Sequence, residues 1–214
     1  MPSEQDWLEQ RKKGIGGSDA AAVIGKSPWK SNIELWQEKT GRLKGDDLIG
    51  NLECVKYGKA AEEHLRALFA LDFPQYEVMH EPFKIYQHKQ YPFLQASLDG
   101  LLTEKETGRR GILEIKTTEI LRSVQNESWN NGIIPDNYYY QVLHYMNVLD
   151  AEFAILKAQL KYVYSDGDIK TVCRHYVLER EKCQDDIDYL QRNEIQFWND
   201  YVLTDTMPPR KVDF

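Results

Sequence analysis

Two charged residues inside a strand-like segment are the first feature of this sequence that could perform chemistry. Residues 111–117 read Gly-Ile-Leu-Glu-Ile-Lys-Thr, and their aliphatic character predicts a buried strand. An unpaired charge in a buried strand is costly, so Glu114 and Lys116 require a partner or a functional role. Because side chains alternate along a strand, both residues are expected on the same face.

A second carboxylate is expected to face Glu114 across a hairpin. Strands over residues 98–103 and 111–117 are separated by a polar loop, and folding them about Glu106 and Thr107 places Asp99 roughly opposite Glu114, with the register open by a residue or two. Facing carboxylates repel each other unless a proton or a cation lies between them. A solvated edge hairpin with a salt bridge between Asp99 and Lys116 is the alternative.

The chemistry that this arrangement predicts is metal-assisted cleavage of a phosphodiester. A hard divalent cation such as Mg²⁺ prefers oxygen ligands, which Asp99, Glu114 and the carbonyl group of Ile115 could supply. Lys116 could orient or deprotonate an attacking water and offset the charge that grows on a phosphate.

Two more polar residues fall on the inward faces of expected helices. Glu62 lies on the apolar stripe of a helix expected over residues 52–71. It is either a further metal ligand, direct or through water, or a rim residue that reaches solvent. Gln141 lies in a helix over residues 137–149 and is either a satisfied core amide or a group that lines a polar cleft.

A glycine-rich turn at residues 14–17 is flanked by Arg11 and Ser18. A turn before a helix N-terminus presents backbone N–H groups to an anion, and an arginine adds a bidentate donor. No Gly-Lys-Ser/Thr follows, so this is not a Walker loop. An ordinary turn with Ser18 and Asp19 as the helix cap is the alternative.

The elements that must position these residues predict an α/β (α+β) fold. It has a central mixed β-sheet flanked by helices, in one domain over residues 1–214, because no repeat or linker interrupts the chain. The expected helices cover residues 4–13, 20–24, 32–40, 52–71, 137–149 and 179–202. The expected strands cover residues 76–80, 83–86, 98–103, 111–117, 153–164 and 171–178.

Composition limits the function classes. A net charge of −7 argues weakly against a nucleic-acid binder but leaves room for a local basic strip. No apolar run approaches the roughly 20 residues that span a bilayer, and the N-terminus lacks an apolar signal segment.

The three scattered cysteines predict reduced, buried or half-buried thiols of a cytosolic protein, and the five histidines lack metal-ligand spacing. Trp29 and Trp36 are expected to pack against their helices, with a DNA-facing Trp29 as the alternative.

Seven motifs in sequence order resemble one family. They are GIGGSDAAAVIG at 14–25, SPW at 27–29, ELWQEKTG at 34–41, YGKAAEE at 57–63, ASLDG at 96–100, LEIKT at 113–117 and a glutamine-bearing helix at 138–149. Together they resemble the YqaJ-type viral recombinases, the phage lambda exonuclease family within the PD-(D/E)xK nuclease superfamily, over roughly residues 5–160.

The resemblance implies a restriction-endonuclease-like core and a 5′-to-3′ exonuclease. Such an enzyme digests one strand of linear double-stranded DNA and leaves a 3′ overhang for a single-strand annealing protein. The resemblance also implies Mg²⁺ as the cofactor, with two ions per site and Mn²⁺ as a possible substitute. It implies a homotrimer that is encoded by a phage or prophage, acts in the cytoplasm of a bacterial host and has no membrane partner. An endonuclease or repair nuclease of the same superfamily, and a non-catalytic DNA-end-binding scaffold, are the alternatives.

Residue by residue, the motifs assign expected roles. Asp99 and Glu114 match the metal carboxylates, Lys116 matches the catalytic lysine, and Glu62 matches the acidic residue of the preceding helix. Four residues match positions near the terminal 5′-phosphate: Arg11, Ser18, Ser97 and Gln141. The residue before Asp99 is Leu98 rather than the proline of the superfamily's name, and metal binding does not depend on that proline.

Overall fold

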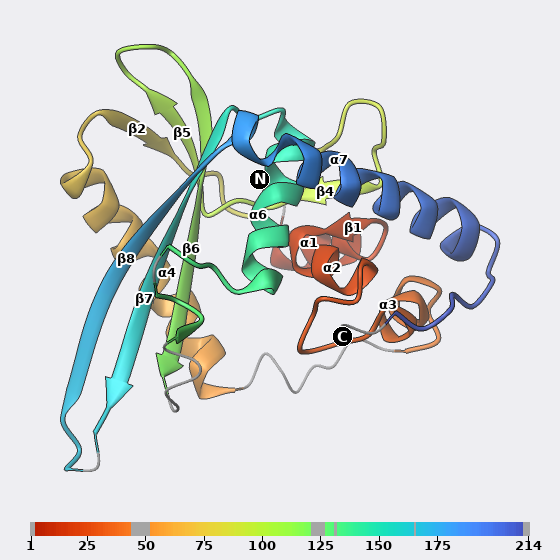
Figure 1. Ribbon diagram of the computed structural model, residues 1–214, viewed down its shortest axis with the longest axis horizontal. Coiled ribbons are helices and arrows are strands. Elements are labelled where there is room, and N and C mark those ends of the chain that lie inside the picture. Colours follow the sequence, from red (N-terminus) through yellow and green to blue (C-terminus); the bar gives the residue numbers. More distant parts are fainter. Residues whose placement is uncertain (1–2, 44–51, 121–126, 131, 165, 212–214) are drawn as a thin grey trace.

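The main sheet of the computed structural model has five strands, is mixed, and lies on the left in Figure 1. The structure describes residues 3–43, 52–120, 127–130, 132–164 and 166–211. The strand order is β2-β5-β6-β7-β8, and only the β6–β7 pair is parallel. The strands are β2 (Tyr76–Met79), β5 (Gly100–Glu104), β6 (Arg110–Ile120), β7 (Phe153–Val163) and β8 (Ile169–Glu179). The predicted mixed sheet is thereby confirmed.

Two long helices cover opposite faces of this sheet. Helix α4 (Glu53–Asp72) buries Leu65 and Phe69 against Leu113, Ile115 and other odd-numbered residues of β6 and β7. Helix α6 (Asp136–Leu149) packs with the even-numbered residues on the other side, Ile112 among them. The alternation of β6 therefore directs Glu114 toward the α6 side of the sheet.

A second, three-stranded sheet was not predicted in full. It joins β1 (Ile15–Gly16), β4 (Leu94–Ala96) and β3 (Tyr86–Gln87) in the order β1-β4-β3, with β1 parallel to β4. The glycine-rich segment enters this sheet, and a Cβ on Gly14 would lie 2.3 Å from the carbonyl oxygen of Phe93. This pairing brings the N-terminal helices beside the loop that carries Ser97.

The helix boundary near this segment corrects the sequence prediction. Helix α1 (Glu4–Arg11) ends before the turn, and α2 (Gly17–Val23) starts at Gly17 with Gly16 as its N-cap. Ser18 is therefore not the cap, and Asp19 lies in the first turn, where its carboxylate accepts a hydrogen bond from the Gly16 N–H at 3.1 Å. The cap expected at Ser18 and Asp19 is therefore wrong in position, because Asp19 lies inside the helix and satisfies the backbone donor of Gly16.

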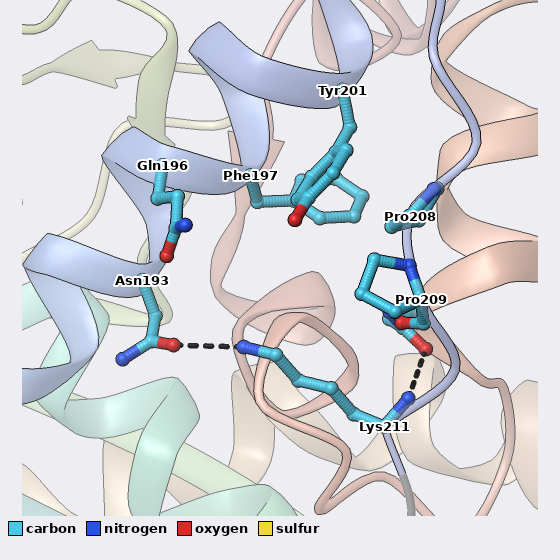
Figure 2. A pocket seen from close by; sticks show the side chains of 8 residues that line it. Asn193, Gln196, Phe197, Tyr201, Pro208, Pro209 and Lys211 are labelled. Atoms are coloured by element: carbon cyan, nitrogen blue, oxygen red, sulfur yellow. Dashed lines mark hydrogen bonds between the residues drawn. The ribbon is translucent and has the colours of Figure 1, made fainter.

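The C-terminal segment closes the α-helical side of the molecule. Helix α7 (Arg180–Gln196) continues as the π-helix η2 (Phe197–Val202), so the predicted single α-helix over residues 179–202 changes type near its end. The segment then passes α3 (Asn32–Lys39), where the Lys211 N–H donates to Asn32 Oδ1 and Lys211 Nζ donates to Asn193 Oδ1 (Figure 2). The cavity between Asn32, Asn193 and Lys211 measures about 20 Å³, enough for one water molecule.

The burial of the tryptophans and cysteines confirms some predictions from the sequence and contradicts others. Trp36 is buried as expected, whereas Trp29 is 79% exposed and does not pack against a helix. Cys183 is buried, but Cys54 and Cys173 are exposed, in contrast to the buried or half-buried thiols expected. Across the described ranges, no helix is both long and apolar enough to cross a membrane.

Candidate active site

The β5–β6 hairpin has the register that the sequence predicted. Gly100 pairs with Leu113 and Leu101 pairs with Ile112, so one further step places Asp99 opposite Glu114. Asp99 lies in the bend before β5, and its Oδ2 accepts a hydrogen bond from the Ile115 N–H at 2.7 Å. Because β6 lies between β5 and β7, the ribbon is not the solvated edge hairpin of the alternative reading.

Glu114 is the most enclosed acidic group of this site. Its residue is 2% exposed, and its Oε1 accepts hydrogen bonds from Lys116 Nζ and from Gln141 Nε2, both at 2.7 Å. The buried Oε2 atom has no hydrogen-bond partner among the described residues. A buried, unpaired carboxylate oxygen is costly, so this atom marks a position where a cation would compensate.

The pKa values of Asp99, Glu114 and Lys116 are all raised, by burial or by neighbouring charges. Burial raises the pKa of Asp99 well above its ordinary value, and the charges of Glu114 and Glu62 raise it further. Burial also raises the pKa of Glu114, although the Lys116 ammonium opposes that shift. Burial would lower the pKa of Lys116, but the charges of Glu114 and Asp99 outweigh it and raise that pKa. Lys116 is therefore an ammonium at neutral pH.

Glu62 reaches the site from α4 with the help of an arginine that sequence reasoning did not single out. Arg66 Nη1 donates to Glu62 Oε1 at 2.9 Å and to the carbonyl oxygen of Asp99 at 2.8 Å. The spacing of four residues between Glu62 and Arg66 is the local signal that could have identified this pair. The link to the Asp99 carbonyl joins two distant segments and has no such signal.

The donor set around Asp99 and Glu114 is small. Within the part of the chain that the structure describes, no group of three or more His, Cys, Asp or Glu side chains is arranged to hold a metal ion. The N–H of Ile115 points to Asp99, and the carbonyl of a strand residue leaves on the same edge as its N–H, so this carbonyl also faces the Asp99 side. Two carboxylates and one carbonyl would suit Mg²⁺, which usually keeps several water ligands.

Three of the four residues expected near a terminal phosphate gather around Trp7. Arg11 Nη2 donates to Ser18 Oγ at 3.1 Å, and the Arg11 guanidinium lies 4.5 Å from the centre of the Trp7 ring. Trp7 Nε1 donates to Ser97 Oγ at 3.1 Å. Trp7 was not singled out from the sequence, because its partner is 90 residues away.

Gln141, the fourth of these residues, is buried and turned toward the carboxylates. Its Nε2 donates to Glu114 Oε1 and, at 3.0 Å, to the hydroxyl of Tyr145 one helical turn later. Gln141 is therefore a buried, hydrogen-bonded amide, as the first of the two readings has it, and its partners are polar groups of the site.

The chain matches a known protein family over most of its length. The profile of the YqaJ-like viral recombinase domain matches residues 6–152, so the chain belongs to that family. The YqaJ protein of Bacillus subtilis (strain 168) is 32% identical over 211 residues, which cover 96% of this chain. The chain spans only 59% of the length of that relative.

Solved structures share the fold. An alkaline exonuclease from Laribacter hongkongensis, LHK-Exo, superposes with a TM-score of 0.64 at 16% identity, covering 94% of this chain and 96% of the other. The same enzyme in complex with dAMP superposes with a TM-score of 0.58 at 17% identity, covering 94% and 97%. The predicted nuclease-type fold is thereby confirmed at the level of architecture.

Proposed function

We propose that this chain is a Mg²⁺-dependent exonuclease that digests one strand of linear double-stranded DNA in the 5′-to-3′ direction and leaves a 3′ overhang. The observation that carries the proposal is the buried Glu114, opposite Asp99 and beside the Lys116 ammonium, with one carboxylate oxygen unpaired. The family of viral recombinases and the alkaline-exonuclease fold support the same activity.

The metal would be held by Asp99, Glu114 and the carbonyl of Ile115. Bound there, Mg²⁺ supplies Lewis-acid stabilisation of the phosphate and a water of lowered pKa. Glu62 is already paired with Arg66 and is 33% exposed on its side chain, which favours a contact through water rather than a direct bond. A second ion and replacement of Mg²⁺ by Mn²⁺ belong to the same proposal and rest on family membership.

Lys116 acts through its charge in this proposal. Because it is protonated at neutral pH, it donates hydrogen bonds to a phosphate oxygen or to the attacking water and does not remove a proton in the resting site. Glu114 holds the ammonium 2.7 Å from its Oε1, which fixes the direction of that donor.

The polarity of digestion is assigned to the donors around Trp7. Arg11 with the hydroxyls of Ser18 and Ser97 offers a cationic and hydrogen-bonding cradle for a 5′-phosphate. Duplex DNA ends, a homotrimer and a single-strand annealing protein are the partners that family membership supports, in the cytoplasm of a bacterial host.

A digestion time course with Mg²⁺ tests the proposal. The substrates are a linear duplex with a 5′-phosphate on one labelled strand, the same duplex without the phosphate, and a closed circle. We expect loss of the phosphorylated strand from its 5′ end, an untouched circle and no activity in EDTA. Arg11→Ala should slow digestion of phosphorylated ends more than that of hydroxyl ends, and Lys12→Ala, which removes the neighbouring exposed charge, is the matched control.

Each other outcome points elsewhere. Nicking of the circle would make the chain an endonuclease with the same chemistry. Binding of ends without cleavage, in a protein that folds and takes up Mg²⁺, would leave the scaffold alternative.

A further inference from the structure

A buried tyrosine that the proposed mechanism does not use lies beside the carboxylates. Tyr145 is 6% exposed and stands on α6 one turn after Gln141. Its hydroxyl accepts a hydrogen bond from Gln141 Nε2 at 3.0 Å, and the same amide donates to Glu114 Oε1. The hydroxyl is therefore one amide group away from the metal carboxylate.

The ring of Tyr145 is held in place by the first residue of α2. A Cβ built on Gly17 would lie 2.4 Å from Cε1 and 2.6 Å from Cζ of this ring, so the backbone of Gly17 rests directly on it. The next residue is Ser18, whose hydroxyl accepts from Arg11. The phenol thus lies where the Arg11 and Ser18 pair meets the Gln141 and Glu114 pair.

The hydroxyl of Tyr145 has a free donor function. The Gln141 amide occupies an acceptor position of the oxygen, and no acceptor for the phenolic proton is found among the described residues. Burial raises the pKa of Tyr145, and the charge of Glu114 raises it further, so the group stays protonated and cannot act as a base. A buried O–H without an acceptor suits an anionic ligand with strong acceptor oxygens.

We propose that the Tyr145 hydroxyl donates a hydrogen bond to the 5′-terminal phosphate of the bound DNA strand and completes, with Arg11 and Ser18, the cradle for that group. This inference rests on the proposed function and adds a residue that links the phosphate cradle to the metal carboxylates through Gln141. Tyr145 is thus a specificity-determining residue for phosphorylated ends.

The test is Tyr145→Phe, which keeps the ring that packs on Gly17 and removes only the oxygen. Binding and digestion are each measured on a 5′-phosphorylated and a 5′-hydroxyl duplex, with binding carried out in Ca²⁺ without turnover. A lost hydrogen bond to a charged group corresponds to a drop of about 10-fold in affinity. We expect this loss for phosphorylated ends and less than about 2-fold for hydroxyl ends. Tyr139→Phe removes a hydroxyl from the same helix that donates to Asp186 instead, and should change neither ratio.

The outcomes separate this inference from the function itself. A selective loss on phosphorylated ends, with an unchanged unfolding temperature, supports it. An equal loss on both ends would mean that the hydroxyl orients Gln141 or contacts the scissile phosphate, and an unchanged ratio would mean that it contacts no phosphate; either result overturns it. If the wild-type chain binds ends but cleaves none, the proposed function fails, while the binding ratio still decides the role of Tyr145.

Discussion

Replacing Lys116 with methionine should lower both stability and activity, and only the stability should recover with metal. Lys116 Nζ lies 2.7 Å from Glu114 Oε1, and the two side chains are 21% and 3% exposed. Methionine keeps an unbranched stem in the same position but leaves the Glu114 charge without its cation. At 25 °C the variant should remain folded.

The expected size follows from the burial of this pair. Removing one partner of a buried ion pair costs about 3–5 kcal/mol, and the partial exposure of Lys116 favours the lower end, about 3 kcal/mol. For a domain of this size about 1 kcal/mol corresponds to roughly 2–4 °C, so the unfolding temperature should fall by roughly 6–12 °C in EDTA. The Lys84–Glu81 pair has a similar length, 2.9 Å, but is exposed, so Lys84→Met should lower the unfolding temperature much less than Lys116→Met.

Thermal unfolding in EDTA and in excess Mg²⁺, followed by the digestion assay, measures both effects. A cation bound to Asp99 and Glu114 replaces the lost ammonium and should restore part of the unfolding temperature. It cannot replace the directed donor, so turnover should stay about 100- to 1,000-fold below wild type. If Lys116→Met unfolds like Lys84→Met in EDTA, or if its turnover stays near that of the wild type, Lys116 does not have the role assigned to it.

Three further changes test the rest of the site. The pKa of Asp99 is raised in the folded chain, so its protonation stabilises the fold at low pH, and this contribution is lost as pH rises through the folded pKa. In EDTA, the metal-free protein should therefore unfold at a higher temperature near about pH 5 than at neutral pH. Asp99→Asn should reduce this difference in unfolding temperature. Arg66→Gln should weaken Mg²⁺ binding about 10-fold in calorimetry, because Arg66 holds the Asp99 carbonyl. Unchanged affinity would mean that Arg66 does not position the metal ligands. Gly17→Ala should cost about 1–3 kcal/mol by overpacking the Tyr145 ring, and Gly16→Ala, whose nearest neighbour atom is 3.9 Å away, should cost less in urea unfolding.

Local patterns in the sequence were sufficient to predict the β5–β6 hairpin. The aliphatic run around Glu114 and Lys116 predicted a buried strand, and the two-residue period placed both side chains on one face. The short loop between the arms then determined which residue faces which, because hairpin register depends on turn length and on the alternation of apolar residues. The Asp99–Glu114 pairing therefore followed from residues that are close along the chain.

Contacts between distant segments were decided only by the tertiary structure. Three contacts join segments that are far apart in the sequence and share no local pattern. They are the hydrogen bond from Trp7 to Ser97, the hydrogen bond from Arg66 to the Asp99 carbonyl, and the packing of the Tyr145 ring against Gly17. The exposure of a side chain was likewise decided by the tertiary structure. Trp29 and Trp36 are the same residue type, but Trp29 is exposed and Trp36 is buried.

The same division explains the helix start at Gly17. Ser18 and Asp19 are both good N-caps by type, and the sequence alone did not choose between them. Pairing of β1 with β4 extends the chain through Gly16, which moves the cap upstream and makes Asp19 a buried partner of the Gly16 N–H. N-cap propensity tells which residue types suit the cap of a helix. The free energy of packing the strands and helices together decides which residue in the chain becomes the cap.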